Sequence, residues 1–378
     1  MLLNNKPENG AAGHGIDETQ KDTEHARMTW IAVADHQSQM VHKASLAKDI
    51  IPQGTLIVET LVAPQGSPQP LLGVQIVGPS QVELQLTAMP KGGLHFLLKH
   101  GAEMTHVAIA HDAEDQADML RISYAWDITT GLGHIVLERP GTNKIFHTEI
   151  KNPLPLTGAM LHELTRTSGQ RLLCDNLCFV AVANQVMPFG PMPAICATAP
   201  VYTPQGTRAA GSLRRGDLVH TLDGDVVPVL QTIRHTLPAR GSFQPVRLRA
   251  PYFGLTQDIV VTPEARLVVG GTQVEYLFGA EKVLVPVKHL TDAASACFET
   301  GHRLVSYVQL LLPDHEAILV GGTALESLSI GRLRRKKTLL SGTLLRGFEN
   351  ATLPEHSKTA YPVLKQFEAI TLAQHRAA

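Results

Sequence analysis

The sequence predicts a mainly β protein with an N-terminal β-sandwich, a second β unit and a short helix-rich tail. Short runs with β-type apolar content recur between residues 28 and 188 at the spacing typical of a sandwich. Turn-forming residues separate these runs, and the 378-residue chain holds 31 glycines and 24 prolines. Helical periodicity is sparse, which favours strands and turns in both parts.

The N-terminal part is predicted to open with a disordered segment. Residues 1–27 are polar and lack apolar periodicity, whereas an apolar run starts at Met28. From there to residue 188 we expect a β-sandwich with one short helix at 157–165. The expected strands are 56–61, 72–76, 82–86, 106–110, 120–126, 133–138 and 146–150.

A proline-rich segment follows the sandwich. Pro191 and Pro193 keep the residues before them extended, so residues 189–198 are interpreted as a linker. The second β unit is expected at 199–330 and the helix-rich tail at 331–378. This division gives each β unit enough residues for its own core.

The tail carries one helix signal. Proline suits the first turn of a helix, so Tyr361-Pro362 is predicted to open one. Val363, Phe367 and Ile370 would then share one apolar side.

Three landmarks in the second β unit point to a known fold. A strand ending at Thr203 meets a Pro-Gln-Gly turn, and a Leu-x-x-Gly-Asp-x-Val run occupies 213–219. Two further blocks lie at 258–266 and 307–322. In this order the landmarks resemble the Hint domain, the horseshoe β fold shared by hedgehog C-terminal domains and inteins. The resemblance is closer still to bacterial Hint-domain proteins of marine α-proteobacteria, and it covers roughly residues 196–372.

The turn inside the first landmark has a structural interpretation of its own. Gly216 can adopt a positive φ without steric cost. Asp217 beside it can accept backbone N–H bonds that close the turn. We therefore expect Asp217 to serve the fold and not the chemistry.

The Hint resemblance implies a self-cleavage site. In a working Hint domain a Cys or Ser attacks the carbonyl carbon of the preceding residue, and a histidine protonates the departing amide nitrogen. Thr262 matches the threonine of the family's Thr-x-x-His block, but Ala265 occupies the histidine position. Counting back from Thr203 in family register places Ala194 at the nucleophile position, and the nearby thiol is Cys196, two residues later.

The candidate catalytic residues are therefore Cys196 as nucleophile, with Thr262 and His315 assisting cleavage of the Ile195–Cys196 bond. A two-residue shift keeps Cys196 on the same strand face as residue 194. His289 is a second candidate proton donor. The alternative interpretation is that both histidines are structural and that Cys196 is a small buried hydrophobe. Splicing is not expected, because Thr323–Ser327 replaces the terminal His-Asn of inteins.

The N-terminal part carries a weaker resemblance. Residues 120–127 and 133–138 look like neighbouring strands of a laminin-G or concanavalin-like sandwich, whose members often bind sugars or Ca²⁺. The acidic residues lack the glycine turn of a calcium loop, so no metal is expected; they are Asp112, Glu114, Asp115 and Asp118. Two functions remain open: a self-processing protein, or an inert Hint module carrying a glycan- or protein-binding sandwich.

The composition limits the other classes of function. With 33 basic and 34 acidic residues, charge implies no nucleic-acid partner. No apolar run is long enough for a membrane span, four irregularly spaced cysteines suit neither a disulfide scaffold nor a metal site, and no cofactor motif is present. Residues 1–27 lack the pattern of a secretory signal, so the expected location is the cytoplasm, with signal-less secretion left open.

Overall fold

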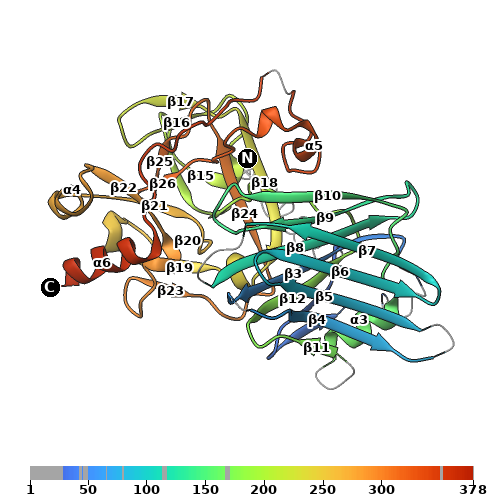
Figure 1. Cartoon of the computed structure of the whole chain (residues 1–378). Coiled ribbons are helices and arrows are strands. Elements are labelled where there is room, and N and C mark those ends of the chain that lie inside the picture. Colours follow the sequence, from blue (N-terminus) through green and yellow to red (C-terminus); the bar gives the residue numbers. More distant parts are fainter. Residues whose placement is uncertain are drawn as a thin grey trace, which may run out of the picture.

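A computed structural model describes residues 29–41, 45, 50–64, 66–78, 81–112, 117–166, 171–349 and 352–377. The disorder predicted for residues 1–27, as well as Glu114 and Asp115, lies outside the described residues. Figure 1 shows two β-rich units side by side, which confirms the mainly β fold class.

The N-terminal unit is a sandwich of two antiparallel sheets and one helix, α3 (Gly158–Thr165). The seven-stranded sheet has the order β10-β9-β8-β3-β12-β1-β2, and the five-stranded sheet has the order β11-β4-β5-β6-β7. The strands are β1 (Trp30–Ala34), β2 (Gln39–Val41), β3 (Gln53–Val62), β4 (Gln69–Ile76), β5 (Val82–Met89), β6 (Gly93–His100), β7 (Glu103–Ala110), β8 (Asp118–Asp127), β9 (Leu132–Glu138), β10 (Ile145–Lys151), β11 (Arg171–Leu173) and β12 (Leu177–Ala183).

The two sheets differ in what covers their outer faces. In β5 and β6 buried residues alternate with exposed or half-buried ones, because only one face of the five-stranded sheet packs on the core. β3 and β8 each contain a run of seven buried residues. β12 explains the difference: Val180 and Val182 enter the sandwich core, whereas Phe179 and Ala181 belong to a cluster shared with the second β unit. The second unit therefore covers the seven-stranded sheet.

The second unit contains two six-stranded antiparallel sheets and one two-stranded sheet. Their orders are β18-β24-β13-β20-β19-β23, β15-β14-β25-β26-β21-β22 and β16-β17. The strands are β13 (Ile195–Cys196), β14 (Pro200–Thr203), β15 (Gly206–Ala209), β16 (Leu218–His220), β17 (Val226–Pro228), β18 (Gln231–Pro238), β19 (Val246–Leu248), β20 (Ile259–Val261), β21 (Arg266–Gly270), β22 (Lys282–Pro286), β23 (Ala296–Phe298), β24 (Leu304–Leu311), β25 (Ala317–Val320) and β26 (Thr323–Glu326).

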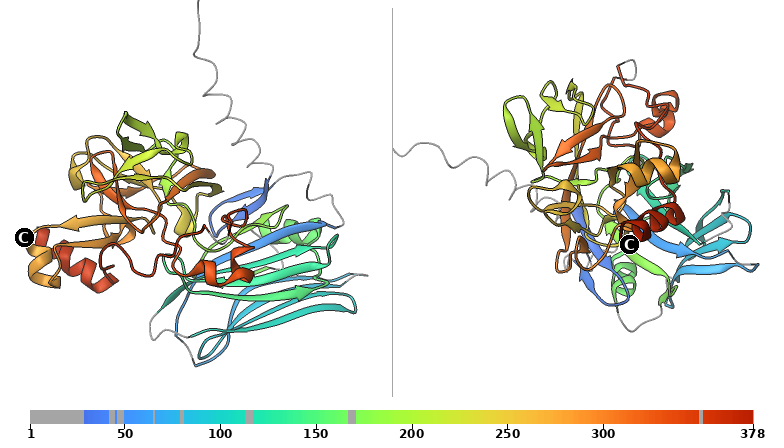
Figure 2. Two further views of the ribbon diagram at one scale, coloured as in Figure 1. Left: turned by 90° about the horizontal axis from the view of Figure 1, so that it is seen from above. Right: turned by 90° about the vertical axis from the view of Figure 1, so that its left-hand side faces the viewer.

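Short helices fill the corners of this unit. They are η1 (Ala210–Ser212), η2 (Gly241–Phe243), η3 (Tyr252–Gly254), α4 (Thr272–Phe278), η4 (Val287–His289), η5 (Leu333–Arg335) and α5 (Lys337–Leu340), followed by α6 (Gln366–Ala377). Two views of the ribbon show the helix α6 at the end of the unit that lies away from the sandwich (Figure 2).

The predicted glycine turn is present. Gly216 has a φ of 90°, and Asp217 Oδ2 accepts a hydrogen bond of 2.8 Å from the Arg214 backbone N–H. The Arg208 guanidinium lies 3.0 Å from the same oxygen. Asp217 therefore holds the turn before β16, as expected from the sequence.

The C-terminal helix begins later than the sequence predicted. Pro362 O accepts a 2.8 Å hydrogen bond from Leu284 N, and Leu364 N donates one of 2.9 Å to Leu284 O. Residues 362–364 thus run beside β22 in extended conformation, and α6 starts at Gln366. Backbone pairing with the sheet outweighs the local helix signal of Tyr361-Pro362.

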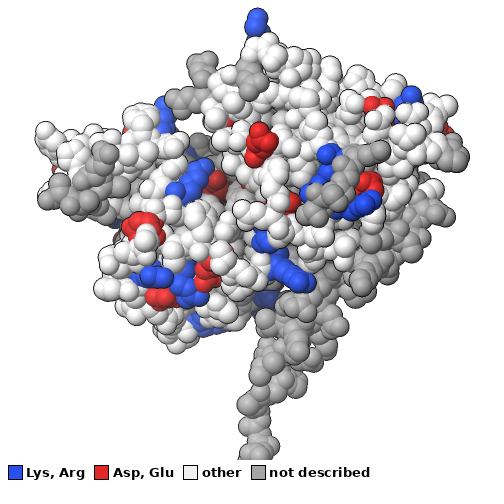
Figure 3. All heavy atoms as spheres, turned by 90° about the horizontal axis from the view of Figure 1, so that it is seen from below, with Lys and Arg blue, Asp and Glu red and all other residues white. Residues whose placement is uncertain are grey.

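The described surface shows no large region of one charge in the view from below (Figure 3). Basic and acidic side chains are interspersed there among uncharged residues. Within the described part of the chain, no helix is long and apolar enough to cross a membrane.

Candidate functional site

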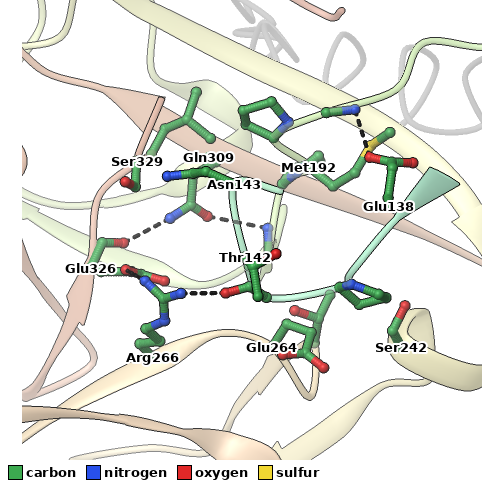
Figure 4. A pocket seen from close by; sticks show the side chains of 18 of the residues that line it. Glu138, Thr142, Asn143, Met192, Ser242, Glu264, Arg266, Gln309, Glu326 and Ser329 are labelled. Carbon is green, nitrogen blue, oxygen red and sulfur yellow. Dashed lines mark hydrogen bonds and ion pairs between the residues drawn. The ribbon is translucent and has the colours of Figure 1, made fainter. Parts of the chain in front are cut away.

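A polar cleft lies where the sandwich, the proline-rich segment and the second β unit meet. Its cavity volume is about 110 Å³. The β9–β10 hairpin of the sandwich contributes residues 139–143, and the proline-rich segment contributes 190–194. The remaining walls come from η2, the end of β20, and the strands β21, β24 and β26. Figure 4 shows Thr142 and Asn143 of the hairpin beside Gln309 and Arg266.

Ala194 lies in the wall of this cleft with both of its backbone polar groups bonded. Its carbonyl oxygen accepts a 2.8 Å hydrogen bond from Thr262 N, and its N–H donates to Gln309 Oε1 at 3.2 Å. Gln309 Nε2 in turn donates to the backbone carbonyl of Glu326 at 2.7 Å. The segment is therefore fixed at the residue that sequence counting assigns to the nucleophile.

Thr262 and Ala265 occupy two sides of the turn that follows β20. Thr262 is buried, lines the cleft, and accepts a 3.1 Å hydrogen bond from Ala265 N at its backbone carbonyl. Ala265 is 2% exposed and packs in the core of the second unit. The methyl group of Ala265 can neither donate nor accept a proton.

Cys196 lies away from the cleft. Register pairs Cys196 with Tyr307, and its Sγ lies 3.5 Å from Thr198 Oγ1. Cys196 is not among the described residues that line the cleft. Ile195 pairs with Val261, so Cys196 lies two residues further along the strand than Ala194, whose carbonyl bonds to Thr262 N.

His315 is buried behind the cleft. Its Nδ1 accepts a 2.9 Å hydrogen bond from Ala360 N, which leaves the proton of a neutral imidazole on Nε2. Nε2 lies 3.3 Å from Glu326 Oε2, yet the pair lacks the alignment of a hydrogen bond. Glu326 lines the cleft, whereas His315 does not. His315 can thus influence the cleft through Glu326.

His289 is the last residue of η4 and is not among the described residues that line the cleft. Burial, followed by the neighbouring Lys288 ammonium, lowers the pKa of His289. A lowered pKa favours the neutral imidazole at pH 7, which is a poorer proton donor than an imidazolium.

The structure thus brings Thr262 together with Ala194 and leaves Cys196 and His315 outside the cleft. Three polar residues of the cleft walls were not predicted from the sequence: Gln309, Arg266 and Glu326. The Arg266 guanidinium donates to Glu326 Oε2 at 3.0 Å and to the Gly141 carbonyl of the sandwich hairpin at 2.5 Å. Gln309 had a signal, because a polar residue inside the apolar run 307–312 is unusual.

The cleft and the remaining cysteines do not suggest a metal site. Among the described residues, no group of three or more His, Cys, Asp or Glu side chains is arranged to hold a metal ion. The four cysteines are unpaired, and burial raises the pKa of Cys178 to about 12.

Comparison with known families identifies the second unit. Residues 193–332 match the family described as the Hint domain. Residues 193–332 are therefore a Hint domain, and a β-sandwich precedes them in the chain. No curated protein matches the chain.

Several solved structures share weak likeness with the chain. The CBM40 of the Ruminococcus gnavus IT-sialidase bound to alpha2,3 sialyllactose has 12% identity and a TM-score of 0.27, over 38% of this chain and 81% of that one. Tailspike protein 2 of bacteriophage CBA120 has 13% identity and a TM-score of 0.26, over 36% of this chain and 23% of that one. A pentraxin from Limulus polyphemus has 10% identity and a TM-score of 0.21, over 36% and 53%.

Proposed function

We propose that this chain is a Hint-domain protein that has lost self-cleavage and keeps the Hint fold as a rigid module joined to the sandwich. The observation that carries the proposal is the cleft itself. Ala194 and Thr262 are in hydrogen-bonded contact in its wall, and Ala265, at the family's histidine position, is buried in the core of the second unit and does not line the cleft. Neither a thiol nor an imidazole is among the described residues that line it.

Self-cleavage requires two functions that this cleft lacks. The thiol or hydroxyl group of a Cys or Ser must add to the carbonyl carbon of the preceding residue, and the C–N bond must then break as the leaving nitrogen gains a proton. Loss of a general acid typically costs about 10²- to 10⁴-fold in rate. Loss of the nucleophile removes the acyl shift altogether.

Cleavage by Cys196 at the Ile195–Cys196 bond is the rival function. Ile195 pairs with Val261 of β20 and Val308 of β24, so this peptide lies within the sheet and has a strand on either side. A tetrahedral intermediate there would disturb the pairing on both sides. The geometry therefore favours the inert module over cleavage by Cys196, Thr262 and His315.

Intact-mass measurement on freshly purified chain, with and without dithiothreitol, separates these two functions. We expect a single species of full length in both samples. Fragments that end at Ile195, and that disappear in a Cys196→Ala variant, would establish the rival function. A Cys297→Ala variant is the matched control, because Cys297 is also half-buried and unpaired.

The sandwich is the part to which we assign ligand binding. A groove of about 560 Å³ crosses β4, β5 and β11 of the five-stranded sheet, on the face that the Hint domain leaves open. Gly73 has no side chain there, and Gln75, Glu83 and Gln85 line the groove. Amide and carboxylate groups on a sheet face suit the hydroxyl groups of a glycan or the backbone of a protein ligand.

A glycan array tests the glycan alternative. We expect bound glycans to be lost from a Gln85→Ala variant and retained by Gln205→Ala, an exposed glutamine on the Hint domain. An array without binding to the full chain would leave a protein ligand as the surviving assignment for the groove. Equal binding by both variants would remove the groove from the proposal.

A further inference from the structure

The two β units share a buried apolar cluster. Trp30, Ile57 and Phe179 of the sandwich pack with Phe243 and Tyr307 of the Hint domain, and each of these side chains is buried. The Trp30 indole N–H also donates a 2.9 Å hydrogen bond to the backbone carbonyl of Thr236. Such continuous burial resembles the core of one domain more than a contact between separable domains.

A polar row crosses the same interface. Register aligns Glu59, Arg121 and Glu138 on the neighbouring strands β3, β8 and β9. Both carboxylates bind groups from outside the sandwich. Ser242 N and Oγ each donate to Glu59 at 2.6 Å, and Gly190 N donates to Glu138 Oε1 at 2.8 Å. Separation of the units would remove the Ser242 bonds of Glu59 and the Gly190 bond of Glu138, whereas the 3.1 Å ion pair of Glu59 with Arg121 would remain within the sandwich.

Two glycines bring the backbones of the units into close contact. Gly141 of the sandwich has a φ of 78°, and a Cβ there would overlap the Glu264 carboxylate of the Hint domain. Gly241 of the Hint domain has a φ of 55°, and a Cβ there would overlap the Glu59 carboxylate of the sandwich. In each unit the backbone of a glycine, which has no Cβ, thus lies against a glutamate carboxylate of the other unit.

We infer that the Hint domain is a permanent non-covalent partner of the sandwich, so that a break in the connecting chain does not release it. A Hint domain that frees its passenger needs an interface that opens after cleavage. Here the apolar cluster, the buried charged row and the reciprocal glycine contacts hold the two units independently of the peptide bond. The inference concerns association alone and stands whether or not the chain cleaves itself.

The test uses the full chain with a specific protease site inserted between Asn184 and Gln185, whose side chains are both exposed. After complete cleavage, size-exclusion chromatography with light scattering gives the mass at about 1 μM, where a transient contact between domains dissociates. We expect one species with the mass of the uncut chain, and two species in urea. Two species in native buffer would overturn the inference.

Alanine substitutions at the two interface glycines test where the sandwich and the Hint domain interact. Gly241→Ala and Gly141→Ala should each weaken association of the cut halves by about tenfold or more, which corresponds to about 1.4 kcal/mol. Gly224→Ala and Gly101→Ala are matched controls, because both glycines have positive φ while an added Cβ meets nothing within 4 Å. Equal weakening by test and control variants would contradict the assigned interface. If one test variant fails to fold, the other, on the opposite unit, gives an independent measurement.

Discussion

At the scale of single residues, Gly216 and Asp217 differ from Cys196 in how far along the chain their relevant neighbours lie. Gly216 and Asp217 form the expected turn because both depend on neighbours in the sequence. Gly216 adopts a positive φ, and the Asp217 carboxylate accepts a hydrogen bond from the N–H of Arg214, three residues earlier. The role assigned to Cys196 needed the distance to Thr262, which depends on how β13 lies between β20 and β24. Spacing along the chain does not contain that information.

Asp217 provides the first prediction. The Asp217→Ala substitution should destabilise the Hint domain by about 1 kcal/mol, the typical loss for one hydrogen bond near the surface. The Arg214 N–H would lose its acceptor and the Arg208 guanidinium its partner. Chemical denaturation followed by a probe in the Hint domain measures the loss. An unchanged midpoint would mean that water replaces the carboxylate without cost.

Two half-buried histidines, His134 and His235, whose Nε2 atoms are shielded from solvent, provide the second prediction. Burial, and for His134 also the neighbouring His147, lowers the pKa of His134 to about 4, and burial lowers that of His235 to about 4. The unfolded chain takes up these protons near pH 6.5, whereas the folded chain does so only near pH 4. The stability that these histidines contribute is therefore fully present above pH 6.5 and is lost as the pH falls to about 4.

The expected loss is on the order of 1–3 kcal/mol for each histidine. Urea denaturation at pH 7 and pH 5 measures it. His134→Gln should reduce the difference between the two pH values, because glutamine does not titrate. His162→Gln, at an exposed histidine of α3, should leave the difference as it is in the parent chain. A difference unaffected by His134→Gln would show that other groups cause it.

At the scale of elements, turns indicated seven strands of the sandwich, but β6, which lies between the turns at Pro90–Gly92 and Gly101, was not predicted. The seven strands expected in the sandwich all correspond to observed strands, because proline and glycine turns mark their ends. β12 was missed, since Leu-Cys-Phe-Val-Ala-Val-Ala is apolar on both faces and has no period of two. The second face of β12 is buried only because the Hint domain covers it, and local sequence does not show this contact.

The proline-rich segment provides a prediction at this scale. Its prolines predict an extended linker, but Phe189 is buried against the rings of His134 and His147 and lies where a Cβ at Gly342 would be. We therefore expect residues 187–196 to resist limited proteolysis as long as the chain is folded. Phe189→Ala should expose the segment and produce an early cut there. An early cut in the parent chain would mean that the segment is accessible in solution.

At the scale of the whole molecule, the sequence indicated two β units in the right order but did not indicate that they pack against each other. Motifs and turns act within one unit, whereas Glu59 and Ser242 are 183 residues apart and meet only in the folded chain. The cleft likewise forms only in the folded chain, because one wall is the β9–β10 hairpin of the sandwich and the others belong to the Hint domain. Neither the composite cleft nor the buried interface could be read from local patterns.

The last prediction restores the lost chemistry and follows its consequence for the whole chain. Ala194→Cys with Ala265→His places a thiol beside Thr262 and an imidazole at the family's histidine position. Dithiothreitol should then cleave the bond after Pro193 about 10²-fold faster or more than in Ala265→His alone, which still lacks a nucleophile in the cleft. Adding Thr262→Ala should slow this cleavage, because it removes the hydroxyl group of the cleft-lining residue at the family's threonine position, while the backbone N–H that bonds to the carbonyl of residue 194 is kept. Mass spectrometry under denaturing conditions should show two fragments, while native chromatography of the same sample should show one particle, since the interface holds the sandwich after the bond is broken. If the doubly substituted chain remains uncut, narrowing of the cleft by the sandwich hairpin, with Gly141 bonded to Arg266, is the physical obstacle to test next.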